Sequence, residues 1–206
     1  MLTFDEKEHR YQWCGITVPS VTQILGEWVR VDIGRGWYVS TFTGQAIDAE
    51  TFEAAGRMGT AIHDMLHAYL QDDLDEGGTS PELLKVLAQF KAWQETFKPE
   101  IELAEAVMYS EKYGYAGTMD CVCKIGRDHW LIDWKSGAFS TAGPQLAAYE
   151  KLYQETTESR LPLKRAVLSL PKNGEKFKWL PQTSREDWPF FQARLYQYNY
   201  LNKGRK

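Results

Sequence analysis

The sequence predicts an α+β fold of the three-layer type, with a central mixed β-sheet flanked by helices. Two observations lead to this class. Helical patterns fill much of the first half of the chain, and three apolar segments with strand character then follow one another. A further helix and a further strand come after those three segments. This order of helix, three strands, helix and strand is typical of an α+β core with a mixed sheet.

The N-terminal quarter contains short elements that can be located from turn and capping residues. The segment HRYQWCGITV predicts a short hairpin around Gly15. Ser20 and Gln23 have the spacing of a capping box, which predicts the start of a short helix. Residues 26–44 carry glycines and aromatics without a clear period, so we expect an irregular segment. A helix is predicted from about residue 46 through 70.

The remaining elements follow from apolar period and punctuation. Ser80 and Pro81 form a good N-cap and N1 pair, and one apolar face then extends to Phe97. Asn173-Gly174 is a strong hairpin signal, and Ser184 is expected to cap a last helix. Strands are expected at about 102–110, 114–125, 129–135 and 164–170, and a helix at about 144–156.

Length and composition indicate one domain. A chain of 206 residues with 43% hydrophobic residues can bury a sizeable core. No internal repeat or low-complexity linker divides it, so residues 1–206 are read as one domain. Its core is expected at about 56–180, with an N-terminal extension (1–55) and a C-terminal helix (184–202). No apolar run of about eighteen residues exists, which predicts that the chain does not span a membrane.

The charges are unevenly distributed along the chain. The net charge is −4, but residues 1–150 carry −11 and residues 151–206 carry +7. A cationic C-terminal quarter suits contact with phosphates, and a solvated basic tail explains it equally well. Cys121 and Cys123 stand at i and i+2 on one strand and are expected to pack as small buried hydrophobes in a reducing compartment. We therefore expect a cytoplasmic location.

The segment from residue 114 to 149 brings charged residues onto adjacent strands. Asp133 and Lys135 point to the same face of a strand because side chains alternate, and Trp134 points to the other. If Asp120 lies beside them on the neighbouring strand, two carboxylates and one ammonium converge. Such a group suits a hard divalent cation and the charge that develops on a phosphate. An Asp-x-Lys triplet taken alone more often forms an ordinary cross-strand salt bridge.

Further motifs accompany this triplet in a fixed order. They are His63 in GTAIH, Glu105 in AEAVMYS, Asp120 in GYAGTMD, the LIDWKSG strand, and Gln145-x-x-x-Tyr149. In this order the chain resembles the PD-(D/E)XK nuclease superfamily. It is most similar to the RecB-like branch, which includes many phage exonucleases and the mitochondrial genome maintenance exonucleases. The resemblance spans residues 19–170 and implies a restriction-endonuclease-like core.

The resemblance implies a metal-dependent deoxyribonuclease that hydrolyses phosphodiester bonds from single-stranded DNA ends, in repair or recombination. The metal site would hold Mg²⁺ or Mn²⁺ through four residues. These are Asp120, Asp133, the backbone carbonyl of Trp134, and His63, which would ligate the metal or position water. Lys135 would position the attacking water or offset charge on the phosphate. Glu105 is a further candidate at the same site.

Other residues are expected to hold the nucleic acid. Gln145 and Tyr149 are one helical turn apart and can reach the same phosphate, although an ordinary amphipathic face gives the same pattern. Lys164, Arg165 and Lys172 are expected to bind the DNA backbone without reading bases. Three aromatic residues offer stacking surfaces for unpaired bases, with core packing as the commoner alternative: Trp28, Trp37 and Tyr38.

The expected partners follow from what the chain lacks. It contains no P-loop, so unwinding would require a helicase, and a recombinase or single-strand-binding protein is a further candidate partner. A bacterial or phage-infected cell is the expected setting.

Two other functional classes remain open. His63 and His67 in HDMLH resemble half of a zincin motif, although Asp64 stands where that motif has Glu. A buried structural histidine explains His63 as well. A nuclease-fold protein that binds DNA without cutting it is the second alternative.

Overall fold

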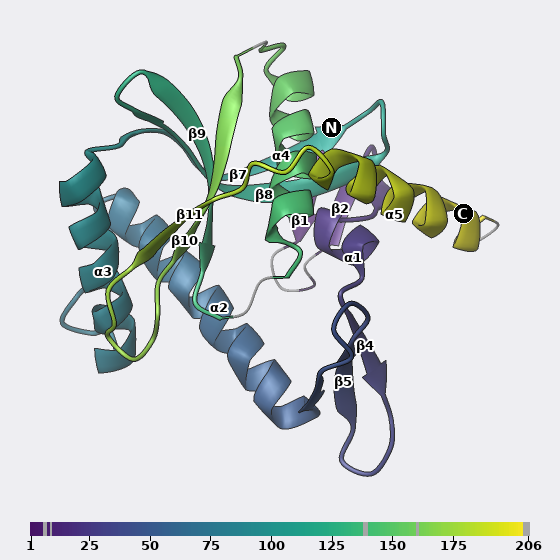
Figure 1. Ribbon diagram of the computed structural model, residues 1–206, viewed down its shortest axis with the longest axis horizontal. Coiled ribbons are helices and arrows are strands. Elements are labelled where there is room, and N and C mark those ends of the chain that lie inside the picture. The colour runs from purple at the N-terminus through teal and green to yellow at the C-terminus, as the bar shows by residue number, and fades with distance from the viewer. Residues whose placement is uncertain (6–7, 9, 138–139, 160, 204–206) are drawn as a thin grey trace.

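A five-stranded mixed sheet forms the centre of the protein in the computed structural model, which describes residues 1–5, 8, 10–137, 140–159 and 161–203 (Figure 1). Its strand order is β11-β10-β9-β8-β7. Strands β9 and β10 run parallel, and the other neighbouring pairs run antiparallel. The strands are β7 (Glu100–Ser110), β8 (Tyr115–Ile125), β9 (Asp128–Lys135), β10 (Leu163–Ser169) and β11 (Lys178–Pro181). The predicted α+β class with a mixed sheet is confirmed.

Helices cover both faces of this sheet. Side chains of α2 and α3 pack with one set of strand residues, and side chains of α1, α4 and α5 pack with the other set (Figure 1). The described helices are α1 (Val21–Leu25), α2 (Ala49–Leu70), α3 (Pro81–Phe97), α4 (Ala142–Thr156) and α5 (Asp187–Leu201). The sheet is therefore the middle of three layers.

Aromatic packing anchors the layer formed by α2 and α3. Trp134 projects from β9 onto α3, where it meets Phe90 at 5.2 Å and Trp93 at 5.8 Å between ring centroids, edge to face. Edge-to-face rings contribute about 0.5–1.5 kcal/mol beyond the burial of their area. Cys121 and Cys123 are fully buried in the same cluster, as predicted. This packing fixes β9, and with it the residues on either side of Trp134.

The N-terminal segment forms a small antiparallel sheet of β1 (Leu2–Asp5), β2 (Arg10–Trp13) and β3 (Ile16–Val18). The predicted hairpin is confirmed: Cys14 and Gly15 both have positive φ, 49° and 80°, as a tight hairpin turn requires. The predicted capping box is also present, because Ser20 and Gln23 bond reciprocally at the start of α1. The chain then touches the central sheet, where the Ala116 N–H donates to the Pro19 carbonyl.

The expectation of an irregular segment over residues 26–44 is wrong. This region contains β4 (Trp28–Val31) and β5 (Trp37–Ser40), which pair antiparallel and are joined by β6 (Ala46–Asp48). The strands are only three or four residues long, too short for the alternation of apolar residues to stand out. The following helix consequently begins at Ala49, where Asp48 caps it, instead of at residue 46.

Two C-terminal details differ from expectation. The β10–β11 hairpin exists, but its connection is longer than the Asn173-Gly174 turn, since β11 begins only at Lys178. Ser184 does not cap α5: its hydroxyl accepts the Glu186 N–H in a turn before the helix, which begins at Asp187.

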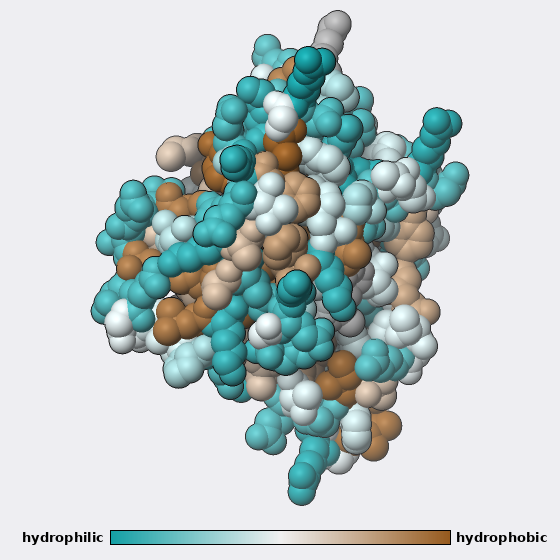
Figure 2. All heavy atoms as spheres, turned by 60° about the vertical axis from the view of Figure 1, so that its left-hand side comes forward, coloured by the Kyte–Doolittle hydropathy of each residue, from teal (hydrophilic) through white to brown (hydrophobic). Residues whose placement is uncertain are grey.

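Figure 2 shows the surface on the side of α3, where hydrophilic and hydrophobic residues are interspersed. Within the described residues, every helix is too short or too polar to cross a lipid bilayer.

Candidate metal centre

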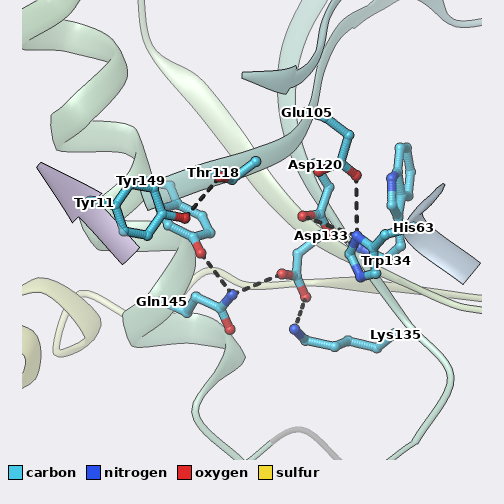
Figure 3. Close-up of polar contacts among 10 residues, drawn as sticks. All are labelled: Tyr11, His63, Glu105, Thr118, Asp120, Asp133, Trp134, Lys135, Gln145 and Tyr149. Carbon is cyan, nitrogen blue, oxygen red and sulfur yellow. Dashed lines mark hydrogen bonds and ion pairs between the residues drawn. The ribbon is translucent and has the colours of Figure 1, made fainter. Parts of the chain in front are cut away.

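The centre begins where β8 and β9 separate. The last pair of their ladder joins Cys121 to Ile132, so Asp120 and Asp133 stand just beyond it. There the Asp120 side chain takes the place of a backbone acceptor. Its Oδ2 accepts a hydrogen bond from the Trp134 N–H at 2.7 Å. The predicted neighbourhood of the two aspartates is present, and Trp134 contributes an N–H donor to Asp120 in addition to its buried ring (Figure 3).

Glu105 reaches the same place through an unusual backbone. It lies in β7 with φ of 47°, between Ala104 and Ala106, which pair with β8 on either side. The left-handed conformation costs a residue with a side chain roughly 1–2 kcal/mol. In this conformation its carboxylate lies toward His63 and Asp120 (Figure 3). Backbone strain of this kind concentrates at functional sites.

His63 closes the cluster from α2, which packs on the face of the sheet opposite to α4 (Figure 3). Its Nδ1 lies 3.2 Å from Glu105 Oε1 and 3.6 Å from Asp120 Oδ1. All three ligand atoms lie within 4.8 Å of one another. Neighbouring ligands of one octahedral cation stand about 3 Å apart, so one ion can bind all three after small adjustments. The donor set of one imidazole and two carboxylates fits Mn²⁺ or Mg²⁺.

Asp133 and Lys135 extend the cluster on its other side. Asp133 is 1% exposed, and its Oδ2 forms an ion pair with Lys135 Nζ at 3.0 Å. Its Oδ1 accepts from Gln145 Nε2 at 3.1 Å (Figure 3). The Asp-x-Lys triplet therefore forms a salt bridge within one strand and not the cross-strand bridge of the alternative interpretation, and the pair lies beside Asp120 and His63 (Figure 3). Four strand residues and two helix residues, His63 and Gln145, thus meet in one network.

Burial and crowding shift the titration of this network. Burial raises the pKa of Asp133 to about 6, although Lys135 opposes the rise and Asp120 adds to it. Burial likewise raises the pKa of Asp120, against the opposing charge of His63. Burial would lower the pKa of His63, but the charge of Asp120 and the hydrogen bond that His63 donates to Glu105 raise it to about 9. The carboxylates therefore repel one another in a dry site, and a divalent cation would relieve that repulsion.

Gln145 and Tyr149 face inward, toward the carboxylates. Gln145 Nε2 donates to both Asp133 and the Tyr149 hydroxyl, and both residues are buried. The Tyr149 ring lies against Gly117, where a Cβ would stand 2.6 Å from the ring. The pair thus holds Asp133 in place, and the contact of both residues with a phosphate stays a prediction.

Sequence reasoning missed Tyr11 and Thr118. The Tyr11 hydroxyl of β2 lies 2.8 Å from Thr118 Oγ1 on β8, two residues before Asp120 (Figure 3). The charges of Glu105 and Asp120 add to the effect of burial in raising the pKa of Tyr11, which places it in the same electrostatic environment. Because 107 residues separate Tyr11 from Thr118, no local pattern connects them.

The three basic residues predicted to bind the DNA backbone are not gathered around the cluster of candidate metal ligands. Lys164 is at the far end of the β9–β10 pair, where it bonds to Asp128 at 2.6 Å. Arg165 is mostly buried and ion-paired with Asp187 at 3.2 Å, so it holds α5 to the sheet. Lys172 follows the end of β10 that lies beside Lys135. Of these three, Lys172 alone lies at the same end of the sheet as the carboxylates.

The N-terminal aromatics are divided between packing and exposure. Trp28 and Tyr38 pack against Phe52 of α2, with ring centroids 5.2 and 4.0 Å apart. Trp37 is 42% exposed. Core packing thus accounts for Tyr38, and Trp37 presents a ring to solvent.

The zincin alternative lacks its second histidine. Among the described residues, the group able to hold a metal consists of His63, Glu105 and Asp120, and His67 is not part of it. The buried His67 Nδ1 has no hydrogen-bond partner within the described part of the chain.

A cavity of about 710 Å³ gives access to this network. It reaches Lys135 and Gln145 and is walled by residues of α1, α4 and α5. No protein-family model and no curated protein matches this chain. The functional assignment therefore depends on the residues and geometry of the site itself.

Proposed function

We propose that this protein is a metal-dependent deoxyribonuclease of the PD-(D/E)XK type, similar to the RecB-like branch. One observation supports the proposal above all: a row of carboxylates from three adjacent strands meets an imidazole and an ammonium at the point where β8 and β9 separate. Its members are Glu105, Asp120, Asp133, His63 and Lys135. A network built only for stability would not crowd carboxylates whose pKa values burial raises.

The residues fit a hard divalent cation. Glu105, Asp120 and His63 would hold one ion, and Asp133 is placed to share it or to hold a second. When bound, such a cation polarises a phosphodiester and generates hydroxide from water near neutral pH. The imidazole favours Mn²⁺ over Mg²⁺, because nitrogen ligands suit the softer ion.

Lys135 supplies the positive charge at the reacting phosphate. Burial would lower the pKa of its ammonium, but Asp133 and Asp120 outweigh burial and raise it, so the group stays charged. A fixed ammonium beside the site stabilises charge on the phosphate oxygens in the transition state. Gln145 keeps Asp133 oriented through Oδ1, which leaves Oδ2 toward Lys135.

We further propose that the enzyme works from ends and prefers a single strand. The first half of α2 and the β4–β5 hairpin extend beyond the sheet (Figure 1), and Trp28 at the start of β4 lines the cavity. A flexible single strand can pass between such projections, whereas a rigid duplex cannot bend around them. A helicase, recombinase or single-strand-binding protein would then supply the unpaired DNA.

The test is cleavage of end-labelled DNA with Mg²⁺, Mn²⁺, Zn²⁺ or EDTA. Asp120→Asn, Asp133→Asn and Lys135→Ala should each lower the rate by at least about 10²-fold, since each removes a charge at the reacting phosphate. Asp128→Asn is the matched control, because it removes a surface carboxylate that pairs with Lys164. Full activity of a folded Asp133→Asn protein would refute the proposal.

Two substrates test the end requirement. Linear single strands should be degraded, and covalently closed single-stranded circles of the same sequence should survive. Rapid cutting of circles would identify an endonuclease. A wild-type protein that binds the linear strand without cutting it, in every metal, would instead be a binding protein with a nuclease-like site.

A further inference from the structure

The cavity beside Lys135 is a groove between α1 and α5. Its walls include Trp28 after α1, Tyr198 and Asn202 near the end of α5, and Gln145 at its inner end. At about 710 Å³ it falls within the roughly 300–1,000 Å³ range of pockets that hold small organic groups. The groove leads directly from the proposed reaction centre toward the C-terminal end of α5.

The charges along the groove select what can enter. Among the described residues that line it, Lys135 is the one cation and Glu27 is the one carboxylate, and Glu27 lies close enough to interact with the Lys135 charge. Glu27 is fixed by hydrogen bonds from the Ser140 and Thr141 hydroxyls. A phosphate bound at Lys135 would therefore be attracted by the ammonium and would leave little room for a second anionic group near Glu27. An uncharged flat group meets no such barrier.

The groove is held open by contacts between its walls. Arg194 of α5 donates from Nε and Nη2 to the Leu25 carbonyl, at 3.0 and 2.6 Å. This carbonyl belongs to the last residue of α1, where a cation is favoured by the helix dipole. Trp28 is held on its other side by Phe52. The two aromatic walls therefore exist before any ligand arrives, which lowers the ordering cost of binding.

From this geometry we infer that the groove is a nucleobase subsite, in which Tyr198 and Trp28 contact one unpaired base adjacent to the phosphate held at Lys135. The inference rests on the proposed function and specifies its substrate: a strand whose base is free to leave a duplex. Stacking on aromatic rings tolerates every base, because each has a π-face. The subsite therefore predicts weak sequence preference and strong dependence on the presence of a base.

The experiment combines a protein change with a substrate change. Single-turnover cleavage is measured on linear single strands that carry one abasic residue at successive positions from the cut bond. For the wild type, one position should lower the rate by about tenfold, the scale of one base–aromatic stack. Tyr198→Ala should lose the same factor on the intact strand and nothing further on the strand that is abasic there. Tyr198→Phe should keep the wild-type profile.

Tyr196→Ala is the matched control, since Tyr196 lies on the same helix with 74% exposure and does not line the groove. An equal loss for Tyr198→Ala on intact and abasic strands would show a merely structural role and overturn the inference. If the wild type cuts no strand, the proposed function fails. The same variants are then compared by fluorescence anisotropy of strand binding. If an abasic residue weakens strand binding by the wild type but not by Tyr198→Ala, the subsite is supported. If it weakens binding by both proteins equally or by neither, the inference is overturned.

Discussion

Replacing Asp133 with asparagine should stabilise the protein in the absence of metal while it abolishes the proposed hydrolysis. Burial, with Asp120 adding to it, raises the pKa of Asp133 from 3.8 to about 6 despite Lys135. That difference corresponds to ~3 kcal/mol by which the fold disfavours the carboxylate. Asparagine removes the charge and keeps the shape. Lys135 is not left without an anion, because Asp120 also raises the pKa of its ammonium.

The effect has a defined pH dependence. Between pH 3.8 and about 6 the folded state keeps a proton on Asp133 that the unfolded state has lost. The free energy of unfolding of the wild type therefore falls as pH rises through that window, and the deficit persists above it. The variant should match the wild type near pH 4 and exceed it by up to ~3 kcal/mol at pH 7.5. For a chain of this length this is a rise of about 6–12 °C in melting temperature.

Thermal unfolding with EDTA at the two pH values measures the difference, and urea unfolding gives its free energy. Addition of Mn²⁺ should reverse the order, because the ion binds the folded wild type and removes the repulsion that the variant lacks. Asp128→Asn should show none of these changes. A variant less stable than the wild type at pH 7.5 in EDTA would refute the electrostatic reasoning, whatever its activity.

Three further predictions concern neighbouring residues. His63→Ala should lower Mn²⁺ affinity and the rate of cleavage by about 10²-fold or more. His67→Ala should change neither, because His67 lies outside the cluster. Equal losses for the two variants, together with bound zinc, would favour the zincin alternative. Mn²⁺ affinity measured by titration calorimetry should rise about tenfold per pH unit up to about pH 9. The reason is that the ion must displace the proton that the neighbouring carboxylates stabilise on His63. An affinity independent of pH from 7 to 9 would contradict this. Gly117→Ala should destabilise the fold by about 1–3 kcal/mol, because its methyl group would stand 2.6 Å from the Tyr149 ring, and a variant that melts with the wild type would show that the ring moves freely.

The sequence was sufficient to place Asp133 and Lys135, the site residues of β9. Alternation alone puts Asp133 and Lys135 on one face and Trp134 on the other, and the structure has them so. The capping box at Ser20 and the turn at Gly15 were predictable for the same reason, since each depends on residues within a few positions.

The features of the site that could not be predicted from the sequence depend on contacts between distant segments. The position of Glu105 requires a left-handed residue within a strand, which no pattern of residue types announces. The inward orientation of Gln145 and Tyr149 follows from packing on Gly117, 28 residues before Gln145 in the chain and visible only after folding. The basic character of Arg165 suggested a phosphate contact, but in the structure its guanidinium forms an ion pair with Asp187 of α5.

The assembly of the cluster from residues 63, 105, 120 and 133 has a consequence for synthesis of the protein. No fragment that ends before β9 contains the complete set. A nascent chain on the ribosome would therefore gain the proposed ability to cut DNA only after β7, β8 and β9 have all been synthesised. Under the proposed function, a copy of the chain that terminates before β9 would lack Asp133 and would be unable to cut DNA.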